Sequence, residues 1–233
     1  MSTEALFPVK PPVLVPVVNE SRKFPVNRIF CVGRNYMAHA AEMGVSVDKS
    51  TQSPFYFLKD AATYIPSGSE IPYPLKTQNY HHEIELVIAV GKQGVNIPAS
   101  QAAEYIYGYA CGLDMTRRDV QLAARDQGKP WDLGKNFDQS AVMSDIVSAA
   151  DVQADVNAVN IELRVNGKTT QSSNTQHFIW NIAEIIEDLS TYYELQPGDL
   201  IFTGTPEGVG PVVAGDILEG SVEGIAEVKL QIR

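Results

Sequence analysis

Short runs of β-branched and apolar residues, bounded by glycine, proline or polar residues, recur along this chain and predict β-strands. Asn166-Gly167 separates two of these runs, and this dipeptide is the strongest short-range signal for a β-hairpin. The tail, 212–233, indicates further short strands that are broken by glycines. We expect the other strands at 28–33, 54–59, 83–90, 107–113, 161–165, 168–171 and 200–203.

A helical period is clearest in residues 175–194, where the apolar residues form one stripe and are expected in the core. Residues 35–43 predict a short helix that stops at Gly44, and residues 98–105 predict another. Thr116 to Asp119 has the shape of a capping box, opening a helix toward Gly128. Because strands outnumber helices and do not alternate with them, the pattern favours a mostly antiparallel, β-rich α+β fold.

The chain of 233 residues is expected to form one main domain. Residues 8–25 contain five prolines and indicate an extended segment. We therefore predict an extended N-terminal arm over 1–24 and a single catalytic domain over 25–233. The stretch 60–80 is rich in proline, glycine and serine and predicts a loop.

Composition narrows the possible partners. The net charge of −10 argues against nucleic acid, and no run approaches the roughly 18 apolar residues of a membrane span. The N-terminus lacks the basic and apolar regions of a signal peptide. Cys31 and Cys111 lie in apolar strand-like segments, which is typical of reduced, buried thiols. We expect a cytoplasmic protein that acts on a small molecule, without nucleic acid or membrane.

The predicted strand 83–90 begins with two glutamates. Because strand side chains alternate between faces, Glu83 and Glu85 share a face with Val87 and Ala89. Ionised carboxylates at the end of an apolar face need neutralisation, and Asp114, at the end of a later strand, could join them. All-oxygen ligation suits Mg²⁺ or Mn²⁺ better than zinc. The alternative is an edge strand with two solvated glutamates.

Several other side chains could carry chemistry. His39 and Glu42 are spaced to meet on one helical face, so the pair is either a general base with its orienting carboxylate or a surface ion pair. Lys59 and Lys135 lie in apolar segments. Each could stabilise an oxyanion or hold a carboxylate, and the alternative is a lysine that extends to solvent.

Two further segments could contact a ligand. Arg118 and Gln121 lie near the start of a predicted helix, where anions are favoured, although the arginine could also be solvated. The glycine-rich loop 204–210 carries Thr205 but lacks the ending of a phosphate-binding loop. It is either a ligand-contacting loop or a plain tight turn. The chain contains neither a Gly-x-Ser-x-Gly motif nor a Cys/His zinc spacing.

Taken together and in order, these segments resemble the fumarylacetoacetate hydrolase family. The resemblance covers roughly residues 25–233 and is closest to the short branch with acylpyruvases and fumarylpyruvate hydrolases. Each motif alone is weak, but six in the right order are specific. The matching motifs are Cys31-Val32-Gly33-Arg34-Asn35-Tyr36 with His39 and Glu42, Phe57-Leu58-Lys59, His81-His82-Glu83-Ile84-Glu85-Leu86, Leu113-Asp114-Met115-Thr116-Arg117-Arg118-Asp119-Val120-Gln121, Gly134-Lys135, and Thr203-Gly204-Thr205-Pro206-Glu207-Gly208-Val209-Gly210.

The resemblance implies a mixed β-sandwich roll with peripheral helices, usually as a homodimer. It also implies Mg²⁺ or Mn²⁺ held by Glu83, Glu85 and Asp114. His39 and Glu42 would lie on a lid segment. The remaining matched residues divide into an oxyanion or enolate partner, Lys135, and substrate contacts, which are Lys59, Arg118, Gln121 and Thr205.

The implied reaction is hydrolysis of the C–C bond of a 2,4-dioxo acid such as fumarylpyruvate, giving pyruvate and a carboxylic acid. Water activated by His39 would attack the C4 carbonyl while Lys135 stabilises the oxyanion. Oxaloacetate decarboxylation through the same enolate is the alternative, followed by isomerisation of an unsaturated dioxo acid. A metal-binding protein without turnover would need neither His39, Glu42 nor Lys135. The sequence leaves the acyl group and the choice between Mg²⁺ and Mn²⁺ open.

Overall fold

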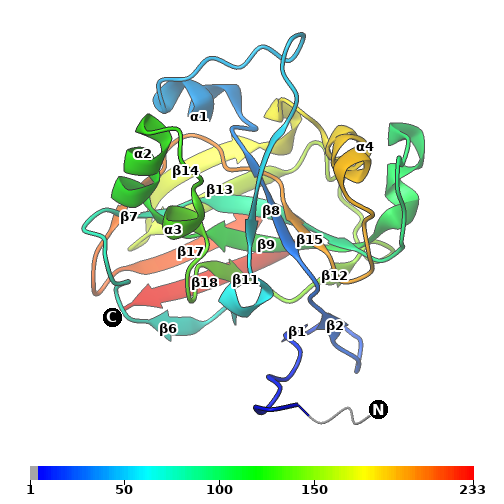
Figure 1. The fold of residues 1–233 in the computed structure, drawn as a ribbon, viewed down its shortest axis with the longest axis horizontal. Helices are drawn as coiled ribbons and strands as arrows, with labels where there is room; N and C mark the ends of the chain where they lie inside the picture. The colour runs from blue at the N-terminus through cyan, green and yellow to red at the C-terminus, as the bar shows by residue number, and fades with distance from the viewer. Residues whose placement is uncertain (1–4) are drawn as a thin grey trace.

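The computed structural model describes residues 5–233, and its strands form four sheets, of which the two large ones lie in the middle of the molecule (Figure 1). Most pairs are antiparallel; β15 with β3, β11 with β5, and β18 with β6 are parallel. The predicted β-rich α+β fold is confirmed. The eight-stranded sheet has the order β4 (Phe55–Lys59), β3 (Ile29–Gly33), β15 (Leu200–Phe202), β8 (Ile84–Val90), β9 (Ile106–Asp114), β11 (Ala141–Met143) and β5 (Tyr64–Pro66), with β12 (Val147–Ser148) also on β9.

The other sheets are smaller. A five-stranded sheet has the order β14 (Lys168–Asn174), β13 (Asn160–Val165), β17 (Ile217–Val222), β18 (Ala226–Ile232) and β6 (Ser69–Ile71). A three-stranded sheet joins β10 (Thr116–Arg117), β7 (Tyr80–His82) and β16 (Gly210–Val212), and a two-stranded one joins β1 (Leu14–Val15) and β2 (Phe24–Pro25). The predicted hairpin of β13 and β14 turns at Asn166 and Gly167, which both have positive φ, as a type I′ turn requires.

Strand β8 is buried on both faces and separates two hydrophobic clusters. Leu86, Ile88 and Val90 belong to the larger cluster, whereas Val87 and Ala89 belong to the smaller one. The alternation predicted from the sequence is therefore present. It places Glu85 on the face of the smaller cluster, at the end of the strand where that apolar face stops.

The helices lie outside the sheets (Figure 1). In α4, Ile185, Ile186 and Leu189 are buried, and Asn181 and Glu184 form a capping box at its start. None of the helices in residues 5–233 has both the length and the apolar character that a membrane span requires. The α-helices are α1 (Met37–Glu42), α2 (Arg118–Asp126), α3 (Asp132–Lys135) and α4 (Ile182–Tyr192), and the 3₁₀ helices are η1 (Ala61–Thr63), η2 (Ala99–Tyr105) and η3 (Thr175–His177).

Three local predictions differ from the structure. The predicted loop 60–80 contains η1, β5, β6 and the start of β7, and the predicted helix at 98–105 is a 3₁₀ helix. The capping box at α2 is wrong, because its cap residue is Arg117. The Thr116 hydroxyl donates to the Asp114 carbonyl at 3.1 Å, and the Asp119 carboxylate accepts the Gln78 N–H at 2.9 Å. Tertiary contacts thus occupy both side chains.

Part of the predicted arm 1–24 packs on the domain. Residues 1–4 lie outside the described residues. Strands β1 and β2 form a hairpin, and Val15, Val17 and Phe24 join the smaller cluster with Ile29. The segment from Leu14 onward is therefore attached to the core, whereas residues 5–12 are exposed.

A single buried asparagine joins the segments that surround the end of β8. The Asn35 side chain donates to the carbonyl oxygens of Trp180 at 3.0 Å and Thr203 at 2.8 Å, and it accepts the Trp180 N–H at 2.8 Å. It lies between β3 and α1, so these bonds fix α1 relative to the end of β15.

Replacing Asn35 with alanine should lower the free energy of unfolding by about 3 kcal/mol, because three hydrogen bonds worth about 1 kcal/mol each are lost in a buried place. Chemical unfolding followed by circular dichroism measures this change. Asn157→Ala, at an exposed position, is the control and should change stability by less than about 0.5 kcal/mol. Equal stability of the two variants would contradict the structural role of Asn35.

Candidate metal centre and active site

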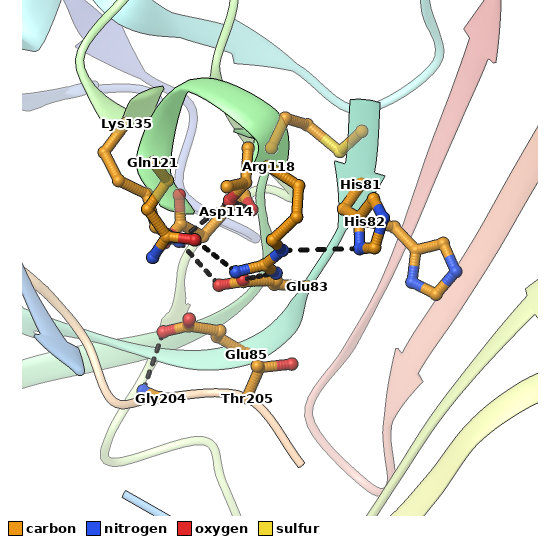
Figure 2. A network of polar contacts seen from close by, with 12 residues as sticks. His81, His82, Glu83, Glu85, Asp114, Arg118, Gln121, Lys135, Gly204 and Thr205 are labelled. Atoms are coloured by element: carbon orange, nitrogen blue, oxygen red, sulfur yellow. Dashed lines mark hydrogen bonds and ion pairs between the residues drawn. The ribbon is translucent and has the colours of Figure 1, made fainter. Parts of the chain in front are cut away.

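Three carboxylates meet at the end of the β8–β9 pair (Figure 2). The Asp114 N–H donates to the Glu83 carbonyl at 2.8 Å, and Glu85 pairs with Gly112 in the ladder. Glu83, Glu85 and Asp114 are 4%, 2% and 0% exposed. One oxygen from each lies within 4.8 Å of the others, so the backbone pairing alone brings the three predicted ligands together.

Cationic side chains surround two of the three carboxylates. Lys135 Nζ donates to Glu83 at 2.7 Å and to Asp114 at 2.6 Å, and Arg118 also donates to Glu83. Glu85 receives the backbone N–H of Gly204 at 2.7 Å (Figure 2). The positive charge is therefore concentrated at Glu83 and Asp114.

The unequal pairing shifts the pKa values in opposite directions. Burial and repulsion from Asp114 and Glu83 raise the pKa of Glu85 well above its usual range. Burial opposes ionisation of Glu83 too, but Lys135 and Arg118 outweigh it and lower its pKa. Burial would lower the pKa of Lys135, but the neighbouring carboxylates raise it, so its ammonium stays charged.

The donor set fits a hard divalent cation. All three groups offer carboxylate oxygens, which Mg²⁺ and Mn²⁺ prefer. Within residues 5–233, the buried oxygen Asp114 Oδ1 accepts no hydrogen bond. Lys59 Nζ lies 2.9 Å from it, but outside hydrogen-bonding geometry. A cation shared by the three carboxylates would satisfy this oxygen and lower the repulsion at Glu85.

Lys59 lies behind the carboxylates, which differs from the predicted substrate contact. Its ammonium donates to the Ser140 hydroxyl at 2.9 Å, to the Met115 carbonyl at 3.3 Å and to the Lys135 carbonyl. These protein oxygens and Asp114 surround it, and it does not line the cavity beside the carboxylates. Strand β4 therefore places the Lys59 ammonium against Asp114, outside the cavity.

Close helix packing positions the groups on α2 and α3. A Cβ at Gly134 would lie 2.8 Å from the backbone nitrogen of Gln121, so the glycine permits the two helices to touch. This contact places Lys135, Arg118 and Gln121 on one side of the carboxylates (Figure 2). The guanidinium of Arg118 also donates to Gln121, which fixes the amide.

Helix α1 brings His39 to the same site, with Glu42 beside it. His39 Nδ1 lies 3.3 Å from Glu42 Oε2, as the spacing predicted, and the Glu42 carboxylate also accepts the Gly208 N–H at 3.2 Å. Burial lowers the pKa of His39, although the charges of Glu83 and Glu42 oppose this shift. The neutral imidazole is therefore favoured, as a general base requires.

A hydrogen-bond chain not predicted from the sequence orients Thr205. Gln171 is fully buried, and its amide donates to the Thr205 hydroxyl at 2.8 Å and to the Pro206 carbonyl at 2.9 Å. Its oxygen accepts the Ile84 N–H at 3.1 Å and faces His82 Nδ1 at 3.0 Å. Because Thr205 accepts from Gln171, its own proton is available to the cavity. The polar strand around Gln171 gave no signal of this role.

One cavity unites most of the predicted residues. Glu42 and Lys59 do not line this cavity, but each contacts a residue that does: Glu42 contacts His39, and Lys59 contacts Asp114. The predicted residues that line it are His39, Glu83, Glu85, Asp114, Arg118, Gln121, Lys135 and Thr205, and the lining residues without a predicted role include Arg34, Met43, Val45, Phe57, Leu122, Arg125 and Trp131.

The family model "Fumarylacetoacetate (FAA) hydrolase C-terminal" matches residues 28–233, the part of the chain that builds both large sheets and the site. The chain belongs to the fumarylacetoacetate hydrolase family. It is 57% identical over 190 residues to a fumarylpyruvate hydrolase of Ralstonia sp, which covers 82% of this chain and 98% of that protein. It is 40% identical over 205 residues to a mitochondrial oxaloacetate tautomerase of Mus musculus, covering 88% and 91%.

Solved structures agree with this membership. Fumarylpyruvate hydrolase from Pseudomonas aeruginosa, crystallised with Mn²⁺ and pyruvate, superposes with a TM-score of 0.93 at 45% identity, covering 98% of this chain and 99% of that one. The resemblance to the family seen in the sequence and the predicted fold class are thereby confirmed.

Manganese should stabilise this fumarylacetoacetate hydrolase family member, because a ligand that binds only the folded state raises stability by about 2.7 kcal/mol at 100 times its Kd. Thermal unfolding of EDTA-treated protein, with and without Mn²⁺, measures the shift. In Glu85→Gln, the shift at the same Mn²⁺ concentration should fall strongly, whereas without metal the variant should be no less stable, since repulsion among the carboxylates is relieved.

Glu104→Gln is the matched control, because this glutamate is exposed and pairs with Lys92 on the surface. It should retain the full Mn²⁺ shift. A full shift in Glu85→Gln would show that the three carboxylates do not hold the ion.

Proposed function

We propose that this protein is a metal-dependent hydrolase that cleaves the C–C bond of 2,4-dioxo acids, with fumarylpyruvate as the first substrate to test. The observation that carries the proposal is one buried cavity lined by both a three-carboxylate cluster and His39. The 57% identity to a fumarylpyruvate hydrolase supports the same reaction. The products would be pyruvate and fumarate.

Glu83, Glu85 and Asp114 would hold Mg²⁺ or Mn²⁺, and the ion, when bound, would act as a Lewis acid and template for the dioxo acid. Mn²⁺ accompanies pyruvate in the related Pseudomonas aeruginosa structure, which supports this ligand set. Lys59, whose ammonium lies 2.9 Å from Asp114 Oδ1, would hold that carboxylate in place by its charge. We propose this positioning role for Lys59 instead of substrate contact.

His39 would act as the general base. With Nδ1 directed to Glu42, its Nε2 is free to take a proton from a water molecule that attacks C4 of the substrate. The hydroxide adds to C4, the C3–C4 bond breaks, and its electron pair moves to the pyruvate half as an enolate. Protonation of C3 then gives pyruvate, and the acyl half leaves as fumarate.

The other cavity residues would bind the substrate and stabilise the negative charge that develops on it. Lys135 keeps a raised pKa, so its positive charge is available to the developing oxyanion or enolate. Thr205 has a hydroxyl proton to donate. Arg118 and Gln121, which are joined by a hydrogen bond, would contact the substrate carboxylate.

Oxaloacetate tautomerisation is the second candidate, favoured by the 40% identity to the Mus musculus enzyme. It needs a base to move a proton at C3, and His39 could serve, but no bond between carbons breaks. Oxaloacetate decarboxylation and isomerisation of an unsaturated dioxo acid stay predictions. We also propose that residues 25–233 form the catalytic domain. We propose further that the protein is a homodimer, and sedimentation of the purified protein would test its oligomeric state.

The deciding experiment supplies fumarylpyruvate, acetylpyruvate and oxaloacetate in parallel to Mn²⁺-loaded protein and to an EDTA-treated control. Pyruvate release is measured for all three substrates, and ultraviolet absorbance follows the enol form of oxaloacetate. We expect metal-dependent pyruvate from the acylpyruvates, with fumarylpyruvate preferred. Rapid loss of the enol form without pyruvate from any acylpyruvate would favour the tautomerase and contradict the hydrolase.

The pH dependence should report His39. The base must be unprotonated, and burial lowers the pKa of His39, so kcat/KM for fumarylpyruvate should rise with pH through an apparent pKa below the usual range of histidine and then reach a plateau. His39→Gln should lower kcat/KM by about 10²–10⁴-fold and remove this acidic limb. His177→Gln, at an exposed position, is the control and should retain the wild-type kcat/KM and the acidic limb. An acidic limb that persists in His39→Gln would assign the titration to another group.

A further inference from the structure

Two arginines without an assigned role line the cavity together with the carboxylate cluster. Arg34 and Arg125 are both half-buried, and they come from different elements, the turn after β3 and the helix α2. Like charges facing one cavity repel each other, and repulsion from Arg125 adds to burial in lowering the pKa of Arg34. The arrangement costs stability and therefore calls for an explanation.

Arg34 is fixed in place but has no acceptor. Its φ of 61° lies in the left-handed region, which is unfavourable for a residue with a side chain and is typical of functional positions. Its guanidinium lies 5.8 Å from the ring centroid of Phe55 and 5.6 Å from that of Trp131. In the described part of the chain, no carboxylate or carbonyl accepts a hydrogen bond from it, although a guanidinium carries five donors.

Arg125 lies farther along helix α2 than Arg118, the arginine that contacts the carboxylate cluster. Arg118, Gln121 and Arg125 follow each other at spacings of three and four residues, so they share one face of α2. Arg125 lies about 10 Å along the helix axis from Arg118, which contacts the carboxylate cluster. It donates to the Met43 carbonyl at 3.3 Å and pairs at 3.0 Å with Asp126, a largely exposed carboxylate.

A second group of cations in the cavity that holds the carboxylate cluster suits a substrate with charge at both ends. Fumarylpyruvate is a seven-carbon chain whose terminal carboxylates lie roughly 7–8 Å apart when extended, from C–C bonds of about 1.5 Å. With its 2-oxo acid end at Glu83, Glu85 and Asp114, its second carboxylate would lie toward Arg34 and Arg125. Acetylpyruvate has a methyl group in place of that carboxylate, and oxaloacetate has a chain of only four carbons.

We propose that Arg34, assisted by Arg125, forms a remote carboxylate subsite that selects dioxo acids whose acyl group ends in a carboxylate. This inference rests on the proposed function and adds a substrate class to it. The Arg34 guanidinium lies beside the aromatic rings of Phe55 and Trp131, and its planar donors suit paired hydrogen bonds to a carboxylate. Arg34 would thus act as a specificity residue, without a part in bond cleavage.

The test compares kcat/KM for fumarylpyruvate and acetylpyruvate in wild-type protein, Arg34→Gln, Arg34→Lys and Arg125→Gln. In Arg34→Gln, the ratio of the two values should fall by about 10- to 100-fold, as expected for lost hydrogen bonds to a charged group. Arg34→Lys should recover part of the ratio because it restores the charge but not the paired geometry. Arg125→Gln should lower the ratio less, because Asp126 already engages this arginine.

Arg164→Gln is the matched control, since Arg164 is exposed on β13 and pairs with Glu162 on the surface. Its ratio should equal that of the wild type. If Arg34→Gln fails to fold by circular dichroism, Arg125→Gln decides, and an unchanged ratio there overturns the proposal.

The outcomes for the two proposals are separate. A wild-type protein that releases no pyruvate from either acylpyruvate would overturn the hydrolase function, and the subsite with it. A wild-type protein that hydrolyses both, with the same ratio in Arg34→Gln and Arg125→Gln, would overturn the subsite alone.

Discussion

The burial of three carboxylates at the end of one pair of strands is the constraint on which the rest of the site depends. Isolated ionised carboxylates are costly in an apolar interior, so each must be matched by positive charge or hydrogen bonds. Lys135 and Arg118 match Glu83, and Lys135 and Lys59 lie against Asp114, while Glu85 receives one backbone N–H. A salt-bridge network built for stability alone would pair all three. The uneven pairing leaves Glu85 without a cationic partner, which fits the proposed metal ligand set.

The elements around the carboxylates can be understood as means to deliver these partners. Gly134 permits α3 to touch α2, so that Lys135 reaches both Glu83 and Asp114. Thr116 accepts a hydrogen bond from Lys135 and donates to the Asp114 carbonyl, which aligns the ammonium with the end of β9. The positive φ of Gly204 turns the chain after β15 so that its N–H points at Glu85. Each device is local, but all converge on one cluster.

Features that depend on local periodicity and on the order of motifs could be predicted from the sequence. The alternation along β8 places Glu85 on the face of Val87 and Ala89, with Glu83 just before the strand. The spacing of His39 and Glu42 places these two side chains together. Contacts between segments far apart in the chain could not be predicted in this way. Lys59 and Asp114 meet because β4 and β9, which are far apart in the chain, share the eight-stranded sheet. Gln171 and Thr205 meet because a strand of the five-stranded sheet packs against the loop after β15. The false capping box at Thr116 has the same origin, since tertiary partners took the side chains that the local pattern assigned to the helix.

Glu42 couples the proposed base, His39, to the loop that carries the proposed substrate contact, Thr205. Its carboxylate orients His39 and at the same time accepts the Gly208 N–H, three residues beyond Thr205. Helix α1 is also held to the end of β15 through Asn35, and Thr205 is held from the other side by Gln171. The imidazole and the Thr205 hydroxyl therefore depend on one docked arrangement of α1 and the loop 204–210. Because general base catalysis requires a correctly placed and unprotonated imidazole, the contacts that position the proposed substrate contact would also position the proposed base.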